Sequence, residues 1–297
     1  MDSYLIYTDS AADIPPFYSE KYDIRIIPMD FMLNGEAIVF NTLADDREAL
    51  CERVYTAMKE GADVHTSQIT PFRYIESWRP VLEEGNDILY LCFSSGMSST
   101  WENACTAAET LKEEFPERRL CIVDTLSATA GQGIITVAAC MNREAGMTLE
   151  ENAVWLEEKR LLLCHRFTVG DLDYLHKGGR VSAAVALIGG MLKIKPMIII
   201  DNEGKLEVVA KARSRLASMK ALVKSYENEQ GVKDVPKIIF IGYTGIYEDA
   251  RQLKDMLEEV IDPGTRIDIM CETPIIGVHT GPDFFSICGW GFHRKEA

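Results

Sequence analysis

The densest group of hydroxyl side chains in the sequence lies in residues 94–100, SSGMSST. This segment follows the apolar run Asp87–Phe93. A region with helical spacing of apolar residues begins near Ser98, within the second half of the segment. Glycine lets the backbone approach a ligand closely, and the free N–H groups at a helix start favour a bound anion. We interpret the segment as an anion-binding loop, because a loop that only caps a helix does not need so many hydroxyls.

Two other short segments carry side chains of the same kind. Residues 65–68, HTSQ, stand before Pro71, where a helix is expected to begin, and residues 8–13, TDSAAD, follow the first predicted strand. Asp, Ser and Thr are also ordinary helix-cap and turn residues. For residues 65–68 an anion site and a helix cap therefore stay open as alternatives, whereas residues 8–13 taken alone favour a structural role.

One histidine stands in a setting that is typical of a site. His279 lies in residues 277–282, GVHTGP, after an apolar run. A single histidine is more often structural than functional, but the flanking glycines and proline favour a tight, exposed loop. We interpret His279 as the titratable group of the site.

A reversal of charge marks the region after residue 176. Residues 171–180, DLDYLHKGGR, predict a helix that ends at a glycine pair, which leaves Arg180 without a structural role. Residues 177–215 contain eight Lys and Arg against three acidic residues, in a chain with a net charge of −15. The excess of positive charge indicates contact with phosphate or an acidic partner, although solvated lysines are the common alternative.

These segments stand at the ends of predicted strands, where the loops of an open α/β sheet line a ligand crevice. Short β-branched runs alternate with segments of helical spacing, which indicates βαβ units around a mostly parallel sheet. The expected strands are Leu5–Tyr7, Ile24–Met29, Asp87–Phe93 and Leu120–Val123, and the expected helices are Asp46–Glu60, Pro71–Glu84 and Ser98–Phe115.

The second half of the sequence has a different pattern of predicted strands and helices. After the amphipathic helix Leu149–Arg160, the sequence predicts a strand over Leu161–Val169 and a hairpin formed by Lys195–Ile200 and Lys205–Ala210. We therefore expect an α/β protein with two domains. Residues 1–160 form a mostly parallel α/β/α domain that carries the polar loops, and residues 161–297 form an α+β domain with a mixed sheet.

Composition excludes several classes of protein. The net charge of −15 argues against nucleic-acid binding, which requires clustered Lys and Arg to neutralise phosphates. None of the eight cysteines forms a CxxC pair and the five histidines are scattered, so we expect reduced thiols and no metal site. The apolar stretches are too short to span a bilayer and no signal peptide is visible, so we expect a soluble, cytoplasmic protein.

Six segments in register resemble the DegV family of bacterial proteins: TDSAAD, TSQ, FSSGMSST, DLDYLHKGGRVS, GGMLKIKP and GVHTGP. The resemblance covers nearly the whole chain. It implies two α/β domains that hold one long-chain fatty acid without a cofactor. It also implies a likeness to the lipid-binding subunit of bacterial fatty acid kinase. There a separate ATP-dependent kinase subunit phosphorylates the bound acid to an acyl phosphate for phospholipid synthesis, and the carrier is not itself an enzyme.

The resemblance also assigns roles to residues, with no catalytic residue and no metal ligand among them. Those implied to bind the ligand at its carboxylate end are Thr66, Ser67, Ser94, Ser95, Gly96, His279 and Thr280. Thr8, Asp9 and Ser10 are expected to line the mouth of the site, and Arg180 to face the phosphate or the kinase. A transient membrane contact of the basic stretch is also compatible with this assignment.

The tail of the acid is expected in the second domain, where the apolar residues 181–192 leave room beside it. Two departures from the family pattern bear on the shape of that pocket. Asp283, Phe284 and Phe285 stand where small residues are usual, and Gly242-Tyr243 stands where many members have His-Gly.

Three alternatives stay open at this stage. A serine hydrolase would use Ser94 or Ser95 with His279, but the G-x-S-x-G pattern of a nucleophile elbow is absent. A self-contained kinase would need a phosphate-binding Gly-rich loop or a metal-binding carboxylate cluster, and the sequence has neither. A carrier of another lipid would use the same residues.

Overall fold

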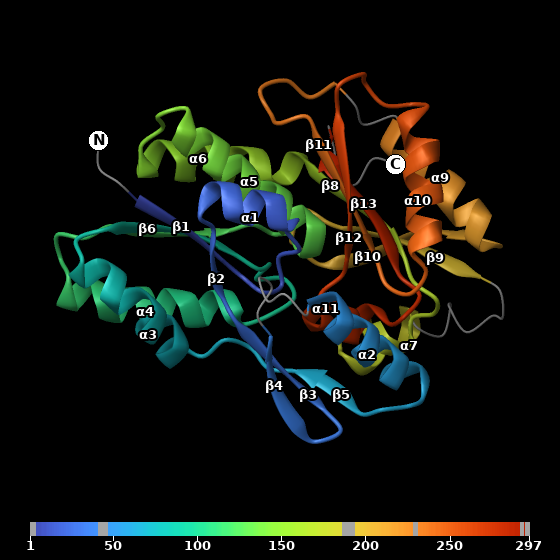
Figure 1. Ribbon diagram of the computed structural model, residues 1–297, viewed down its shortest axis with the longest axis horizontal. Helices are drawn as coiled ribbons and strands as arrows, with labels where there is room; N and C mark the ends of the chain where they lie inside the picture. Colours follow the sequence, from blue (N-terminus) through green and yellow to red (C-terminus); the bar gives the residue numbers. More distant parts are fainter. Residues whose placement is uncertain (1–3, 41–46, 186–193, 228–230, 292–293, 295–297) are drawn as a thin grey trace.

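A computed structural model describes residues 4–40, 47–185, 194–227, 231–291 and 294 of the chain (Figure 1). Its first sheet has four strands in the order β2-β1-β6-β7, and every neighbouring pair is parallel. These strands are β1 (Tyr4–Asp9), β2 (Arg25–Ile27), β6 (Asp87–Cys92) and β7 (Leu120–Asp124). The parallel sheet that the sequence predicts for the first half is confirmed.

Helices cover both faces of this sheet, as its buried strands require. On one face pack α3 (Pro71–Glu83) and α4 (Thr100–Glu114), and on the other pack α5 (Thr129–Glu144) and α6 (Leu149–Lys159) (Figure 1). The short helix α1 (Pro16–Tyr22) contacts α5.

A second, mixed sheet contains six strands in the order β10-β9-β8-β13-β11-β12. They are β8 (Leu163–Thr168), β9 (Lys195–Ile200), β10 (Leu206–Ala212), β11 (Ile238–Tyr243), β12 (Arg266–Cys271) and β13 (Phe285–Trp290). Only β11 and β12 run parallel, and β9 and β10 form the predicted hairpin. Helices α9 (Arg215–Glu227) and α10 (Tyr247–Glu258) pack against this sheet.

A third, small sheet was not predicted. It joins β3 (Met29–Leu33), β4 (Glu36–Phe40) and β5 (Val64–Thr66) in the order β4-β3-β5. The expected strand over Ile24–Met29 is interrupted at Pro28, which has no N–H for a sheet hydrogen bond, so β2 and β3 enter different sheets. The helices α2 (Arg47–Lys59), α7 (Asp173–Lys177) and α11 (Pro274–Thr280) lie near this sheet (Figure 1).

Helix α5 lies between the two large sheets. It contacts β1 and β6 of the parallel sheet, and β8, β11 and β13 of the mixed sheet. Every residue from Thr129 to Cys140 is buried, which is the pattern of a helix enclosed on all sides. Gly133 makes this packing possible, because a Cβ at that position would overlap the carbonyl oxygen of Asp13.

Two further contacts join the halves of the chain. Ser94, in the loop after β6, donates a hydrogen bond of 2.8 Å to the carbonyl of Gly204 in the β9–β10 turn. The buried guanidinium of Arg294 donates to carbonyls of Leu126, Arg160 and Leu163. In the described residues, the strands of the parallel and small sheets precede residue 160 and those of the mixed sheet follow it. The division into domains at that residue stays a prediction.

No helix in the described ranges is long and apolar enough to cross a membrane.

Replacing Gly133 by alanine tests the enclosure of α5. At an ordinary helix position this change stabilises by up to about 1 kcal/mol. Here we expect the free energy of unfolding to fall by about 1–3 kcal/mol, because the added methyl group would overlap backbone. Chemical denaturation with urea measures it. A gain in stability of the Gly133→Ala variant would contradict the close packing of α5.

Candidate functional site

A cavity of about 800 Å³ opens between the parallel sheet, the mixed sheet and the small sheet. Its volume is in the range of about 300–1,000 Å³ that is typical of small-molecule sites. The apolar part of its wall consists of Ala11, Met29, Phe93, Met97, Ala128, Phe167, Leu175, Ile200, Leu206, Ile275, Ile276 and Phe284. The polar part consists of Thr66, Ser67, Gln68, Thr70, Ser95, Ser98, Ser99, Thr129, His165, Arg180, His279, Thr280, Ser286 and Cys288, with Gly96 among them.

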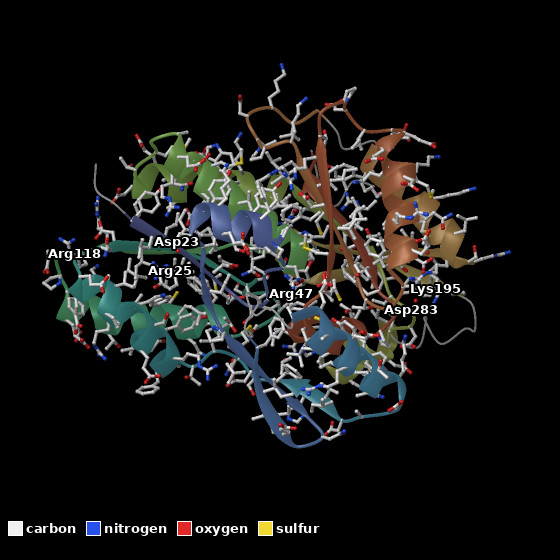
Figure 2. All side chains as sticks on the ribbon, viewed as in Figure 1. Asp23, Arg25, Arg47, Arg118, Lys195 and Asp283 are labelled. Atoms are coloured by element: carbon white, nitrogen blue, oxygen red, sulfur yellow. The ribbon has the colours of Figure 1, made fainter. Side chains whose placement is uncertain are left out.

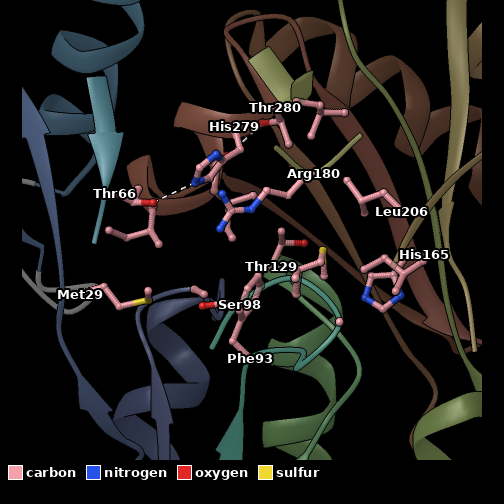
Figure 3. A pocket seen from close by; sticks show the side chains of 18 of the residues that line it. Met29, Thr66, Phe93, Ser98, Thr129, His165, Arg180, Leu206, His279 and Thr280 are labelled. Atoms are coloured by element: carbon pink, nitrogen blue, oxygen red, sulfur yellow. Dashed lines mark hydrogen bonds between the residues drawn. The ribbon is translucent and has the colours of Figure 1, made fainter. Parts of the chain in front are cut away.

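The polar wall has a hydrogen-bonded pair from distant parts of the chain. Thr66 is the last residue of β5, and His279 lies in α11; Thr66 Oγ1 and His279 Nε2 are 2.8 Å apart (Figure 3). When the proton is on Nε2, the imidazole donates to Thr66, and the hydroxyl proton of Thr66 is free for a ligand. Thr280, also on α11, is buried and its hydroxyl contacts the carbonyl of Ile276.

The prediction that residues 277–282 form an exposed loop is wrong. Pro274 begins α11, a short helix whose residues are mostly buried, and its position suits the first turn of a helix. Gly178 leaves room for the imidazole of His279, because a Cβ there would overlap Nδ1. Burial and the positive charge of Arg180 lower the pKa of His279 to about 4, so the imidazole is neutral at pH 7.

Arg180 follows the glycine pair that ends α7, and its side chain reaches the cavity next to His279 (Figure 3). Its guanidinium donates to the carbonyl of Gly178. Burial lowers the pKa of this guanidinium, which nevertheless keeps its charge at neutral pH. Arg180 also lines a second cavity of about 620 Å³ together with Lys205 and Lys211.

In the loop after β6, the hydroxyl side chains point in different directions. Ser95, Gly96, Ser98 and Ser99 line the cavity, as expected of an anion-binding loop. Ser94 does not, which differs from the expectation for it. Its side chain is fully buried, donates to Gly204 and accepts from the N–H of Gly96, because the β9–β10 turn packs directly on this loop.

The expected mouth residues Thr8, Asp9 and Ser10 are also absent from the cavity wall, and each is fully buried. Asp9 accepts hydrogen bonds from the hydroxyl of Tyr90 at 2.7 Å and from the N–H of Phe93 at 3.1 Å. The hydroxyl of Thr8 donates to the carbonyl of Leu91, and that of Ser10 accepts from the N–H of Met29. These side chains hold the ends of β1 and β6 in place, so the expected position at the mouth is wrong.

The basic stretch is partly neutralised within the protein. Asp283 pairs with Lys195 at 2.9 Å (Figure 2). It also pairs with Arg215. Phe284, beside Asp283, forms part of the apolar wall. Residues 186–193, which include most of the predicted apolar segment, lie outside the described residues.

Sequence reasoning missed five polar residues of the wall: Thr70, Thr129, His165, Ser286 and Cys288. His165 lies inside an apolar strand, where a histidine reads as an ordinary core residue. Ser286 and Cys288 lie in β13, which was not predicted. In the sequence, the signal for this part of the site was a single histidine, His165, within a predicted apolar strand.

Comparison with known proteins identifies the family to which the chain belongs. The family model described as "Uncharacterised protein, DegV family" matches residues 3–290. A DegV domain-containing protein of Clostridium perfringens is 36% identical over 281 residues, which cover 95% of each chain.

Two solved structures are similar to this chain over almost its full length, and each is 26% identical in sequence. One, from Thermus thermophilus, is described as fatty acid binding of a DegV family protein, with a TM-score of 0.82 and coverage of 98% of this chain and 100% of that one. The other, from Thermotoga maritima, is described as a DegV lipid binding protein, with a TM-score of 0.81 and coverage of 99% and 100%. The chain belongs to the DegV family.

Proposed function

We propose that this protein binds one long-chain fatty acid, with the carboxylate at the Thr66–His279 pair and the tail in the apolar part of the cavity. The observation that carries the proposal is the composition of the cavity wall. The hydroxyl of Thr66 and the neutral imidazole of His279 form a polar pair in this wall, and twelve apolar side chains line the same cavity. A long-chain fatty acid has the same division between a small anionic head and a long apolar tail.

The head of the acid would be held mainly by neutral donors. The hydroxyl of Thr66 is oriented by His279 Nε2, and Ser67 and Ser95 line the same cavity. The N–H of Ser95 bonds to Asp124 Oδ1 at 3.2 Å, so its backbone is already engaged and its side chain is the available donor. Neutral donors bind a carboxylate without a tight ion pair, which leaves its oxygens reactive towards a phosphoryl donor.

The tail would supply most of the affinity. Transfer of a methylene from water to apolar surroundings contributes about 0.8 kcal/mol, so ~15 methylenes give roughly 12 kcal/mol before ordering costs are subtracted. Ile200, Leu206 and Phe167 from the mixed sheet, with Ile275 and Ile276 from α11, form walls for such a chain. The descriptions of the Thermus thermophilus and Thermotoga maritima proteins as fatty-acid-binding and lipid-binding support this reading.

We also propose that the protein presents the bound acid to a separate ATP-dependent kinase, which would transfer the γ-phosphoryl group to a carboxylate oxygen and release ADP. Arg180 supports this step, because it lines both the main cavity and the second cavity with Lys205 and Lys211. These cations suit the added negative charge of an acyl phosphate. The resulting acyl phosphate would enter phospholipid synthesis, and the carrier itself would need no cofactor.

The geometry does not favour a serine hydrolase. Such an enzyme needs a serine hydroxyl that is hydrogen-bonded to a histidine with a carboxylate behind it. Here His279 Nε2 contacts Thr66, its Nδ1 faces Gly178, and Ser94 Oγ is bonded to Gly204. A carrier of another lipid would share the apolar wall. The identity of the lipid extracted from the protein distinguishes such a carrier from a fatty acid carrier.

Removal of the Thr66 hydroxyl tests the head-group site. Thr66→Val keeps the shape of the side chain, so we expect the fold to persist while the affinity for palmitic or oleic acid falls. A hydrogen bond to a charged group contributes about 1.5–3 kcal/mol, which corresponds to roughly a 10- to 100-fold loss. Isothermal titration calorimetry on the delipidated protein measures the affinity.

Thr106→Val is a matched control for this experiment, because Thr106 is exposed on α4 and its hydroxyl bonds only to the carbonyl of Glu102 in the described residues. We expect an affinity equal to that of the wild type. Equal affinities for the Thr66 and Thr106 variants would remove Thr66 from the head-group site.

Substitution of Arg180 tests presentation to the kinase. In an assay with a fatty acid kinase subunit, ATP and loaded carrier, Arg180→Gln is expected to lower acyl phosphate formation on the order of 10-fold or more. The affinity for the acid itself should fall much less, because neutral hydroxyls hold the carboxylate. If the two quantities fall by the same factor, Arg180 acts on the acid and not on the phosphoryl group.

A further inference from the structure

A second polar group lies across the cavity from the Thr66–His279 pair. Figure 3 shows His165 on the opposite side of the pocket from Thr66. His165 on β8 pairs in register with Cys288 on β13, and Phe167 pairs with Ser286. Because alternate residues of a strand share a face, these four side chains point from the same face of the mixed sheet, and all four line the cavity.

His165 is a buried polar group that lacks a partner. Only 2% of its surface is exposed, and the backbone of Ala128 is a polar neighbour of the ring. Within the described residues neither ring nitrogen makes a well-formed hydrogen bond. Burial and the charge of Arg294 keep the pKa of His165 well below its ordinary value, so one nitrogen is a donor and the other an acceptor. Leaving such a group unpaired costs about 1–3 kcal/mol.

The surroundings hold this imidazole in place. Its Nε2 edge packs against Gly131 in the first turn of α5, where any larger residue would overlap the ring. Helix α5 therefore fixes the ring beside the cavity wall formed by Ala128 and Thr129. A ring that is sterically fixed, buried and unpaired has the properties of a prepared binding group.

Ser286 adds a donor next to His165. Its Oγ accepts a hydrogen bond of 3.2 Å from the N–H of Gly242, which leaves its own proton to donate. The buried thiol of Cys288 has polar neighbours of its own in Ser286, Thr129 and the backbone of Gly131. A plain hydrocarbon chain would cover His165 and Ser286 and give them no new partner in return.

We propose that the cavity selects a long-chain fatty acid with a hydroxyl group along its chain, and that this hydroxyl bonds to His165 and Ser286. A hydroxyl both donates and accepts, so it matches a neutral imidazole and a serine together. The carboxylate would stay at the Thr66–His279 pair on the other side. The inference rests on the proposed fatty acid binding and specifies which class of acid fits.

Competition between stearic acid and the positional isomers of hydroxystearic acid tests this selection. With the delipidated full-length protein, we expect one isomer to bind on the order of 3- to 10-fold more tightly than stearic acid, the effect of one or two hydrogen bonds. The other isomers should bind more weakly, because their hydroxyl would be buried against apolar wall. For each protein variant, calorimetric titration gives the affinity for the preferred isomer divided by the affinity for stearic acid.

Two substitutions separate the two sides of the cavity. His165→Leu is expected to bring the ratio for the preferred isomer down to one or below, and Ser286→Ala to lower it part of the way. His165→Asn, which keeps a donor and an acceptor, should restore part of it. Thr66→Val should weaken both ligands and leave the ratio unchanged.

The outcomes also separate this inference from the proposed function. Binding of stearic acid with no isomer preferred overturns the inference and leaves fatty acid binding intact. A preference that persists in both His165→Leu and Ser286→Ala overturns the assignment to these residues. Failure of the wild type to bind stearic acid or any isomer removes fatty acid binding itself.

Discussion

The enclosure of α5 between two sheets is the constraint on which the rest of the structure depends. A helix that is buried on all sides must present small residues wherever backbone or a large side chain approaches it. Gly133 admits the carbonyl of Asp13 from the loop after β1, and Gly131 admits the imidazole of His165 from the mixed sheet. The cavity lies where α5 begins, at Ala128 and Thr129.

The packing around α5 determines which side chains line the two sides of the cavity. One side receives the end of β5 and the helix α11, which bring Thr66 and His279 together although 213 positions separate them in the chain. The other side is a face of the mixed sheet, with His165 and Ser286. Burial keeps both imidazoles neutral, so Arg180 is the charged group among the described residues that line this cavity. Such a wall suits a ligand that has one anionic end and a long, mostly apolar body.

The sequence predicted the parallel sheet, the β9–β10 hairpin and the segments that surround the cavity. It could not predict which hydroxyls line the cavity. Ser94 and Ser95 are neighbours of the same type, yet only Ser95 lines the cavity, because the β9–β10 turn covers Ser94. That contact joins residues 110 positions apart and has no local signature.

Other differences have similar causes. Asp9 looks like a loop residue by type, but Tyr90 and Phe93 bind its carboxylate in the interior. The glycines of α5 lower its helical propensity, so tertiary enclosure and not local preference makes it a helix. The small sheet arises because Pro28 ends β2 early, and this sheet supplies Thr66.

The most direct test of fatty acid binding is denaturing extraction of the purified protein, followed by mass spectrometry of the released small molecules. We expect about one equivalent of a long-chain fatty acid per chain, with hydroxylated acids enriched over their supply in the host. A protein that releases no lipid, and that also takes up neither oleic nor palmitic acid when these are added, would contradict this expectation.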